Sequence, residues 1–166
     1  MTILMHRRNL LQAGLALSAA FCASRARACE FFAPTLRVTH PWTRATPASA
    51  AFAVLGMRLD DVAEDDQLLD VHTPVAEAVM YAPGGHFGGH AGAMLLPVPG
   101  AGLPLDIPAG RETVLGNADL HGAGPHLRLL RLTQDLEIGR SYPLRLVFRK
   151  GGTVKAQLSV DFARFT

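Results

Sequence analysis

The feature that most constrains this chain is a series of short apolar runs, each bounded by glycine, proline, aspartate or asparagine. In the range 142–148 every second residue is a large apolar one, and the range 154–160 repeats the alternation. A period of two is typical of strands that have one face in the core and the other face in water. After residue 28, no long stretch shows the period of 3.6 that a helix requires. We therefore expect an all-β fold.

The runs predict nine strands separated by turn residues. The expected strands are 36–43, 51–59, 68–72, 76–81, 93–98, 111–115, 126–132, 142–148 and 154–162. The glycines in Lys150-Gly151-Gly152 predict a hairpin turn between the last two, and the acidic residues between 60 and 66 predict a solvated turn. Many short strands at a spacing of about ten residues indicate an antiparallel β-sandwich of Greek-key type.

Residues 1–28 have the three parts of an export signal peptide. Basic residues come first, an apolar run of about 14 residues follows, and Ala26-Arg27-Ala28 has the small-x-small pattern of a cleavage site. The apolar run is shorter than the roughly 20 residues that a helix needs to span a bilayer. Arg7-Arg8 also fits a twin-arginine signal, so the Sec route and the twin-arginine route both stay open. We expect a periplasmic protein without a transmembrane segment after cleavage.

The remainder, residues 29–166, is expected to form a single domain. Cys29 would be its first residue, where a lipid anchor is sometimes attached, although Arg25-Ala26-Arg27-Ala28 lacks the apolar residue that usually stands ahead of an anchored cysteine. The leader holds four arginines and no acid, so the rest of the chain has a net charge of −2. The basic isoelectric point therefore belongs to the leader and gives no reason to expect a nucleic-acid partner.

Catalytic patterns are missing from the sequence after residue 28. Its three serines lie outside any G-x-S-x-G turn, and neither a phosphate-binding G-x-x-x-x-G-K nor a C-x-x-C pair occurs. We therefore expect no enzyme.

Metal ligands are the chemistry that remains. Six histidines and three methionines follow the leader: His40, His72, His86, His90, His121, His126, Met57, Met80 and Met94. Two of the histidines lie in the glycine-rich GGHFGGH of residues 84–90. If 76–81 and 93–98 pair as a hairpin, two of the methionines lie near the base of the same loop. Imidazole and thioether donors together suit copper, above all Cu(I).

Several stretches match a known pattern in the same order along the chain. They are VTHPWTRATP (38–47), PVAEAV (74–79), LLPVPGAG (95–102), LDIPAG (105–110), HLRLLRL (126–132) and LEIGRSYPLRLVF (136–148). With these stretches the chain resembles the periplasmic copper chaperones of the PCu(A)C family. The resemblance implies a cupredoxin-like fold and a protein that shuttles or buffers copper. It also implies partners that donate or accept copper outside the cytoplasm, with cytochrome oxidase assembly factors among them.

The ligand pattern of that family is only partly present. The family holds copper through an early His and Met, a further Met, and a late His-x-Met. Here the late motif keeps His126 but has Arg128 in place of the methionine. The further Met falls near Leu95, and the early His falls near Val79 or near Ala82, depending on the register.

The sequence therefore predicts a copper site of His126 with His86, His90, Met80 and Met94, at one end of the sandwich. Three alternatives stay open. The two methionines could be core residues and the two glycine-flanked histidines solvated turn residues. The copper site could have decayed, because the guanidinium of Arg128 disfavours a bound cation if it points to the same side as His126. In that case the domain would serve a structural or protein-interaction role. The histidine-rich loop could instead bind Zn(II) or Cu(II).

The other candidate side chains are expected to be structural. Met57 and Trp42 are predicted to be core or edge residues. His40 and His72 are predicted to be surface or hydrogen-bonded residues of strands.

Overall fold

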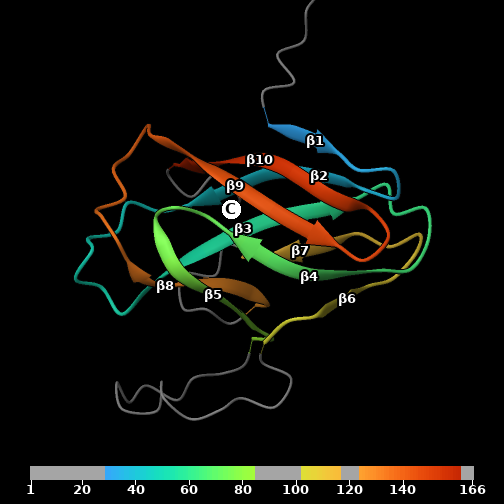
Figure 1. Ribbon diagram of the computed structural model, residues 1–166, viewed down its shortest axis with the longest axis horizontal. Helices are drawn as coiled ribbons and strands as arrows, with labels where there is room; N and C mark the ends of the chain where they lie inside the picture. Colours follow the sequence, from blue (N-terminus) through green and yellow to red (C-terminus); the bar gives the residue numbers. More distant parts are fainter. Residues whose placement is uncertain (1–28, 85–101, 117–123, 162–166) are drawn as a thin grey trace, which may run out of the picture.

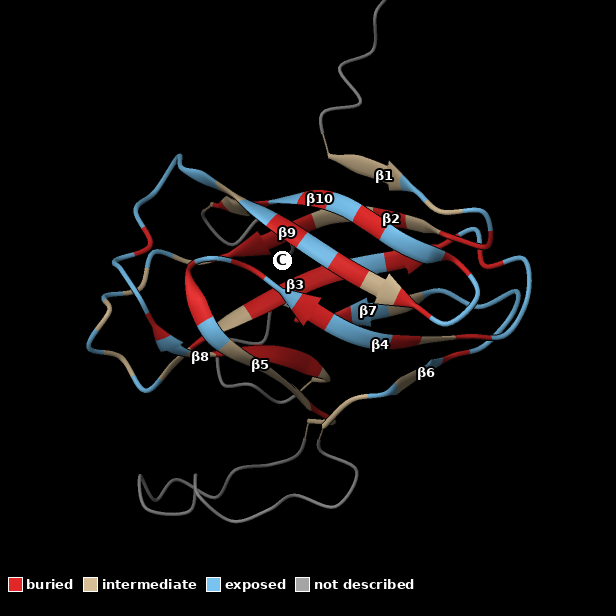
Figure 2. Cartoon of the chain, in the orientation of Figure 1, coloured by how far each residue is buried: buried red, intermediate tan, exposed pale blue. Residues whose placement is uncertain are grey.

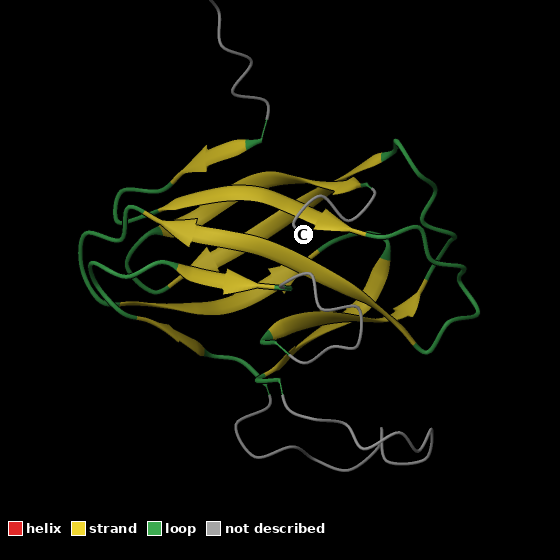
Figure 3. Ribbon diagram, turned by 180° about the vertical axis from the view of Figure 1, so that it is seen from behind, coloured by secondary structure: helices red, strands yellow, loops and turns green. Residues whose placement is uncertain are grey.

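The computed structural model describes residues 29–84, 102–116 and 124–161. These residues form ten strands: β1 (Glu30–Phe32), β2 (Arg37–Thr43), β3 (Phe52–Asp60), β4 (Asp66–His72), β5 (Ala76–Ala82), β6 (Leu105–Ile107), β7 (Thr113–Leu115), β8 (His126–Leu132), β9 (Ser141–Phe148) and β10 (Gly152–Val160). No helix occurs in the described ranges (Figures 1 and 3), so none is present there that could cross a membrane. The all-β prediction is confirmed.

The strands follow the order β5-β8-β3-β2-β10-β9-β4-β6, with β1 added to β2 and β7 added to β3. The sheet folds back on itself, so that β9 passes in front of β3 in Figure 1 and the core lies between the two layers. The pairings are antiparallel except that of β10 with β2, which is parallel. Antiparallel neighbours can be joined by a short turn, whereas this parallel pair joins two strands that are far apart in the sequence.

The hairpin of β9 and β10 shows how the sequence pattern becomes a core. Leu144, Leu146 and Phe148 are buried and alternate with exposed or half-buried residues, as the bands of colour in Figure 2 show. The turn at residues 149–151 leads into Gly152, the first residue of β10, with a φ of 71°, a conformation that glycine adopts without steric cost. The predicted hairpin is confirmed.

Two strands of the structure are not among the expected ones, and one expected strand is not tested. β1 and β6 were not expected, because three residues are too few to show an alternation. The expected strand 93–98 lies outside the described residues, so its pairing with 76–81 stays a prediction. The described partner of β5 is β8.

The prediction of a solvated acidic turn is wrong for two of its residues. Asp60 and Asp66 are buried, with 7% and 4% of their surface exposed. They lie at the end of β3 and at the start of β4, where donors from neighbouring strands reach them, for example Arg37, whose Nε lies 2.6 Å from an oxygen of Asp60. The residues between them include the exposed Asp61 and Asp65, for which the prediction is confirmed.

Candidate metal centre

The start of β8 and the end of β5 form the centre of the candidate site. In their antiparallel register Ala82 lies opposite His126, and Met80 lies opposite Arg128. Residues directly opposite each other in a sheet share a face, so these four side chains belong to one face. The structure thus brings together two of the predicted ligands, Met80 and His126, with Arg128, the residue that was expected to disfavour a bound cation.

The pairing of β5 with β8 also shows which of the two positions expected for the family's early histidine, 79 or 82, lies on the same face as His126. Val79 lies opposite Leu129 and packs against the core. A histidine at position 79 would therefore point away from His126. Ala82 is the one of the two positions that shares a face with His126, and an alanine there offers no ligand.

His126 is almost fully buried, with 2% of its surface exposed. Its Nδ1 lies 2.8 Å from the carbonyl oxygen of Gly124, and its Nε2 lies 3.2 Å from Nε of Arg128. A carbonyl only accepts and a guanidinium only donates, so the proton must be on Nδ1 and the lone pair on Nε2. This is the tautomer in which a histidine binds a metal through Nε2 while Nδ1 is held by a second partner.

The surroundings of His126 keep its imidazole neutral. Burial lowers its pKa below the ordinary value, the hydrogen bond to Gly124 opposes that shift, and the positive charge of Arg128 adds to it. Because a metal competes with the proton for the ring nitrogen, a lowered pKa favours metal binding near neutral pH.

Two contacts of Arg128 bear on the candidate centre. Its Nε donates to His126, and the guanidinium carbon lies 4.8 Å from the centre of the Phe52 ring on β3, a cation–π contact. Arg128 is 6% exposed, and burial lowers its pKa. The guanidinium therefore does point to the same side as His126, and it occupies the lone pair that a metal would need.

Met80 is half-buried, on the opposite face of β5 from Val79 and Tyr81, which pack against the core. The alternative that Met80 is a core residue is therefore not supported. It is the diagonal neighbour of His126, a relation in which Cβ atoms are roughly 7–8 Å apart and long side chains still meet. A thioether at this place can approach the ligand side of the imidazole.

The other predicted ligands, His86, His90 and Met94, lie outside the described residues, as does His121. The two ends of the segment 85–101 are described, however. Gly84 lies two residues after the end of β5, and the amide of Gly102 donates to the carbonyl of Tyr81 at 2.9 Å. Both ends are thus fixed at the end of β5, beside His126. In the described part of the chain, no three His, Cys, Asp or Glu residues gather into a metal site.

A second feature lies on the neighbouring strands, around Trp42. A Cβ on Gly56 would lie 2.5 Å from Nε1 of Trp42, so the indole rests directly on the glycine backbone of β3. The amide of Gly116 donates to the carbonyl of Pro125 at 2.7 Å, which ties the end of β7 to the start of β8. Trp42 and Met57 are 6% and 2% exposed, as the prediction of structural residues required.

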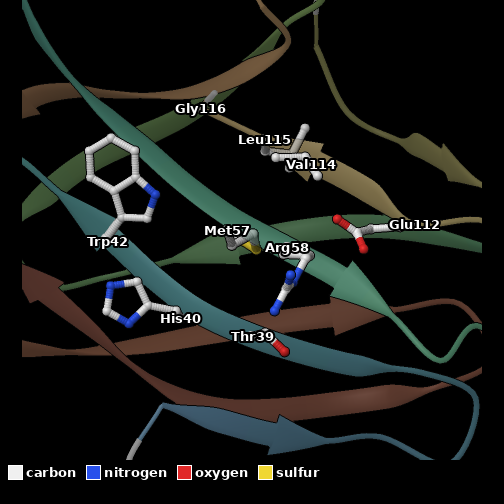
Figure 4. A pocket seen from close by; sticks show the side chains of 9 residues that line it. All are labelled: Thr39, His40, Trp42, Met57, Arg58, Glu112, Val114, Leu115 and Gly116. Carbon is white, nitrogen blue, oxygen red and sulfur yellow. The ribbon is translucent and has the colours of Figure 1, made fainter. Parts of the chain in front are cut away.

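Beside Trp42 a hollow of about 180 Å³ opens between β2 and β7 (Figure 4). His40 and Trp42 stand on its β2 side, and Glu112 and Val114 stand on the opposite side. His40 has a φ of 48°, at the irregularity in the pairing of β2 with β3, and is half-buried. His72 is exposed on β4, as predicted. The sequence pattern does not indicate this hollow, because most of its lining comes from β2, β3 and β7, which only the pairing of the strands brings together.

A family comparison covers most of the domain just described. Residues 36–160 match the LpqE-like family model, whose description is "Putative lipoprotein LpqE-like". The chain belongs to the LpqE-like family. The match starts just before β2 and ends with β10, so it includes every residue of the candidate centre that the structure describes.

Solved structures of similar fold include two PCuAC domains and one further copper-related protein. The copper-bound PCuAC domain from PmoF2 is 20% identical, with a TM-score of 0.63, and the match covers 80% of this chain and 97% of that one. The apo PCuAC domain from PmoF1 is 21% identical, with a TM-score of 0.63 and coverages of 80% and 98%. The solution structure of CuI-DR1885 from Deinococcus radiodurans is 24% identical, with a TM-score of 0.55 and coverages of 86% and 85%.

The fold predicted from the PCu(A)C resemblance, a cupredoxin-like β-sandwich, is therefore confirmed for this LpqE-like chain. No curated protein matches the chain.

Proposed function

We propose that this LpqE-like protein binds Cu(I) and carries it between proteins outside the cytoplasm, without catalysing a reaction. One observation carries the proposal: His126 is neutral, with Nδ1 held by Gly124 and the lone pair of Nε2 directed to the face that Met80 shares. A neutral imidazole and a thioether are donors that Cu(I) prefers. Two structures of the same fold are copper forms, the copper-bound PCuAC domain from PmoF2 and CuI-DR1885.

In this proposal His126 is the first ligand and Met80 the second. Further donors come from His86, His90 and Met94. His86 is four residues after Ala82, so the chain allows it to be at most about 14 Å from a residue that lies opposite His126. The chain is therefore long enough for His86 to be one of the proposed ligands. Arg128 is the one residue of the described centre that does not suit a bound cation.

The place of action that we propose is the periplasm. The signal-like residues 1–28 and the lipoprotein in the family description support export, with Cys29 as the position that a lipid would modify. The partners would be proteins that donate or accept copper. A site with few ligands on one face of a sheet supports such a role, since a partner's ligands can then replace them one at a time.

A second candidate function is favoured by the hydrogen bond from Arg128 to His126 Nε2. In that case the fold is retained without copper, and the domain acts in protein interaction. The third possibility, Zn(II) or Cu(II) held by the histidine-rich segment alone, is separated by the experiment below.

The test is an anaerobic Cu(I) titration against a competing chromophoric chelator. We expect one Cu(I) per chain and a loss of at least about 100-fold in affinity in His126→Ala, which corresponds to ~2.7 kcal/mol. His72→Ala is the matched control, because His72 is exposed on β4, and its affinity should equal that of the unchanged protein.

Two results would count against the proposal. Absence of binding in the unchanged protein would favour the second candidate. Binding that survives His126→Ala but is lost in the double variant His86→Ala, His90→Ala would assign the metal to the histidine-rich segment.

A further inference from the structure

We infer that the hollow beside Trp42 is a second binding site of this domain, for a small aromatic amine that has a hydrogen-bond acceptor at the far end of its ring. The hollow lies between β2 and β7 and has a volume of about 180 Å³ (Figure 4). The inference goes beyond the proposed function, because it requires neither copper nor any residue of the His126 centre.

The hollow has the size and the lining of a site for one aromatic ring. Met57, Val114 and Leu115 contribute apolar surface to it, and the antiparallel pairing of β3 with β7 holds them together. An apolar cavity of about 150 Å³ is large enough to bind benzene. Sites for drug-sized molecules are larger, at about 300–1,000 Å³. A ligand of this hollow therefore has a single ring and a short chain.

The wall of the hollow at Trp42 is held in place by the backbone. A Cβ on Gly56 would lie 2.5 Å from Nε1 and 2.7 Å from Cε2 of Trp42, so the indole rests on the chain of β3. The pairing of β2 with β3 shifts its register between Thr39 and Trp42. Because the indole rests on backbone rather than on a side chain that can turn away, this wall is preformed, which reduces the ordering cost of binding.

The indole N–H of Trp42 is the donor that a ligand would engage. The residue is only 6% exposed, and its Nε1 makes no hydrogen bond to any residue that the structure describes. An indole nitrogen is a donor only, and a buried donor without an acceptor is costly. The nitrogen lies on the side of the ring that faces the hollow (Figure 4). A ligand oxygen at this wall would therefore accept a hydrogen bond from Nε1.

The opposite wall favours a positive charge. Glu112 stands across the hollow from Trp42 (Figure 4), and it forms no ion pair with the described part of the chain. Arg111, its neighbour in the sequence, is not part of the lining. An ammonium group at this side of the hollow would therefore meet a carboxylate that no guanidinium or amine already neutralises.

One cation, Arg58, also lines the hollow, but its charge is offset. Its Nε lies 3.2 Å from an oxygen of Asp60. The ion-pair group to which it belongs contains two guanidiniums and three carboxylates, those of Arg37, Arg58, Glu30, Asp60 and Asp61. The group as a whole is negative, so it does not repel an ammonium group.

The two walls together define the order of groups in the ligand: an acceptor at Trp42, an apolar ring between the walls, and a cation at Glu112. Tyramine has these groups in this order, since its hydroxyl and its aminoethyl chain are at opposite ends of one ring. Two matched probes each lack one of them. Phenethylamine lacks the acceptor, and 4-hydroxyphenylacetate has an anion in place of the cation.

The experiment is a titration of the metal-free full chain with the three probes, followed by proton–nitrogen-15 NMR. Trp42 is the only tryptophan of the sequence, so its indole N–H gives a single resonance that reports on the hollow. We expect tyramine to shift this resonance saturably, with a Kd of about 1 mM or lower. Phenethylamine should bind about fivefold more weakly, because it accepts no hydrogen bond. 4-hydroxyphenylacetate should also bind about fivefold more weakly at low salt, because its charge is repelled by Glu112.

Two variants assign these preferences to residues. Glu112→Gln should bring tyramine and 4-hydroxyphenylacetate to within about twofold of each other. Glu137→Gln is the matched control, because Glu137 is exposed, pairs with Arg140 and does not line the hollow. Trp42→Phe keeps an aromatic wall without the N–H, so the preference for tyramine over phenethylamine should disappear, as read at the amide of Gly116. Glu112 is exposed, so its variant decides the matter even if Trp42→Phe does not fold.

Three results would overturn the inference. They are an indole resonance that none of the probes shifts at about 20 mM, equal affinities for the three probes, and a preference for the cation that persists in Glu112→Gln. None of these results depends on the copper titration. A chain that binds no Cu(I) would still be expected to bind tyramine, so the two proposals fail separately.

Discussion

Two buried polar clusters of this domain are built in opposite ways. At the turn between β9 and β10, the carboxylate of Asp66 accepts hydrogen bonds from the hydroxyl of Thr35 and from the backbone amides of Gln67, Lys150 and Gly151, all at 2.8 Å. Burial alone would raise the pKa of Asp66, but these donors outweigh it and hold the pKa below the ordinary value. Three of the four donors are backbone groups that no ligand can displace.

At the start of β8, by contrast, a single bond between two side chains joins His126 and Arg128. Burial lowers the pKa of both groups, so each has its charged form disfavoured. The imidazole keeps a lone pair that a metal can take over. Burial alone therefore does not distinguish a functional group from a structural one. A functional group also has a hydrogen-bond partner that a ligand can displace. The Asp66 cluster is expected to govern stability, and the His126 cluster is expected to govern metal binding.

The largest effect is expected from breaking the Asp66 cluster. Asp66→Ala leaves three amides and a hydroxyl without an acceptor and should lower the free energy of unfolding by about 4 kcal/mol. Urea denaturation measures this loss. Asp65→Ala is the matched control, since the exposed Asp65 accepts one amide, that of Ala109, and its loss should cost about 1 kcal/mol or less. Similar losses in the two variants would contradict the comparison.

The two clusters should lose their contributions to stability at different pH values as the solution is acidified. His126 has a lowered pKa in the folded chain, so its contribution is complete above the ordinary value of about 6.5 and is lost as the pH falls through the folded value. Asp66 also has a lowered pKa, and its contribution is complete above about 3.9 and is lost as the pH falls further. Unfolding free energy measured from pH 8 to pH 2 should show both steps. His126→Gln should abolish the first step and leave the second; loss of neither would refute the assignment.

Phe52→Leu tests whether the Phe52 ring holds Arg128 beside His126. It removes the ring beneath Arg128, which should cost about 1 kcal/mol of stability, and it should also free the guanidinium to withdraw. Cu(I) affinity in the chelator competition should therefore rise. An affinity equal to that of the unchanged protein would mean that Phe52 does not hold the guanidinium in place.

The smallest effect on stability is expected at Met80. Met80→Leu conserves volume on a half-buried face and should change the free energy of unfolding by less than about 0.5 kcal/mol. It removes the thioether, so Cu(I) affinity should fall about tenfold, or ~1.4 kcal/mol. An unchanged affinity in the chelator competition would exclude Met80 as a ligand.

Much of the fold could be predicted from the sequence, because alternation and turn residues are local signals. The bounds of β8, 126–132, agree with the expected strand, and the β9–β10 hairpin follows from its glycines. β1 and β6 are too short to carry such a signal. The burial of Asp66 depends on donors from other elements, so composition alone indicated a solvated turn.

The candidate centre could be predicted only in part. His126 was found from the H-x-M-like spacing, but the direction of Arg128 depends on Phe52, a residue of another strand. The choice between Val79 and Ala82 depends on the register of β5 with β8, which sequence does not give when neither position holds a ligand.

The central claim is that Cu(I) replaces Arg128 at Nε2 of His126. Nitrogen-15 NMR of the histidine side chains, before and after one equivalent of Cu(I), tests it directly. The account predicts a shift of the Nε2 resonance of His126, an Nδ1 that stays protonated because Gly124 still accepts from it, and a change at Nε–H of Arg128. Cu(I) bound with the His126 and Arg128 resonances unmoved would contradict it.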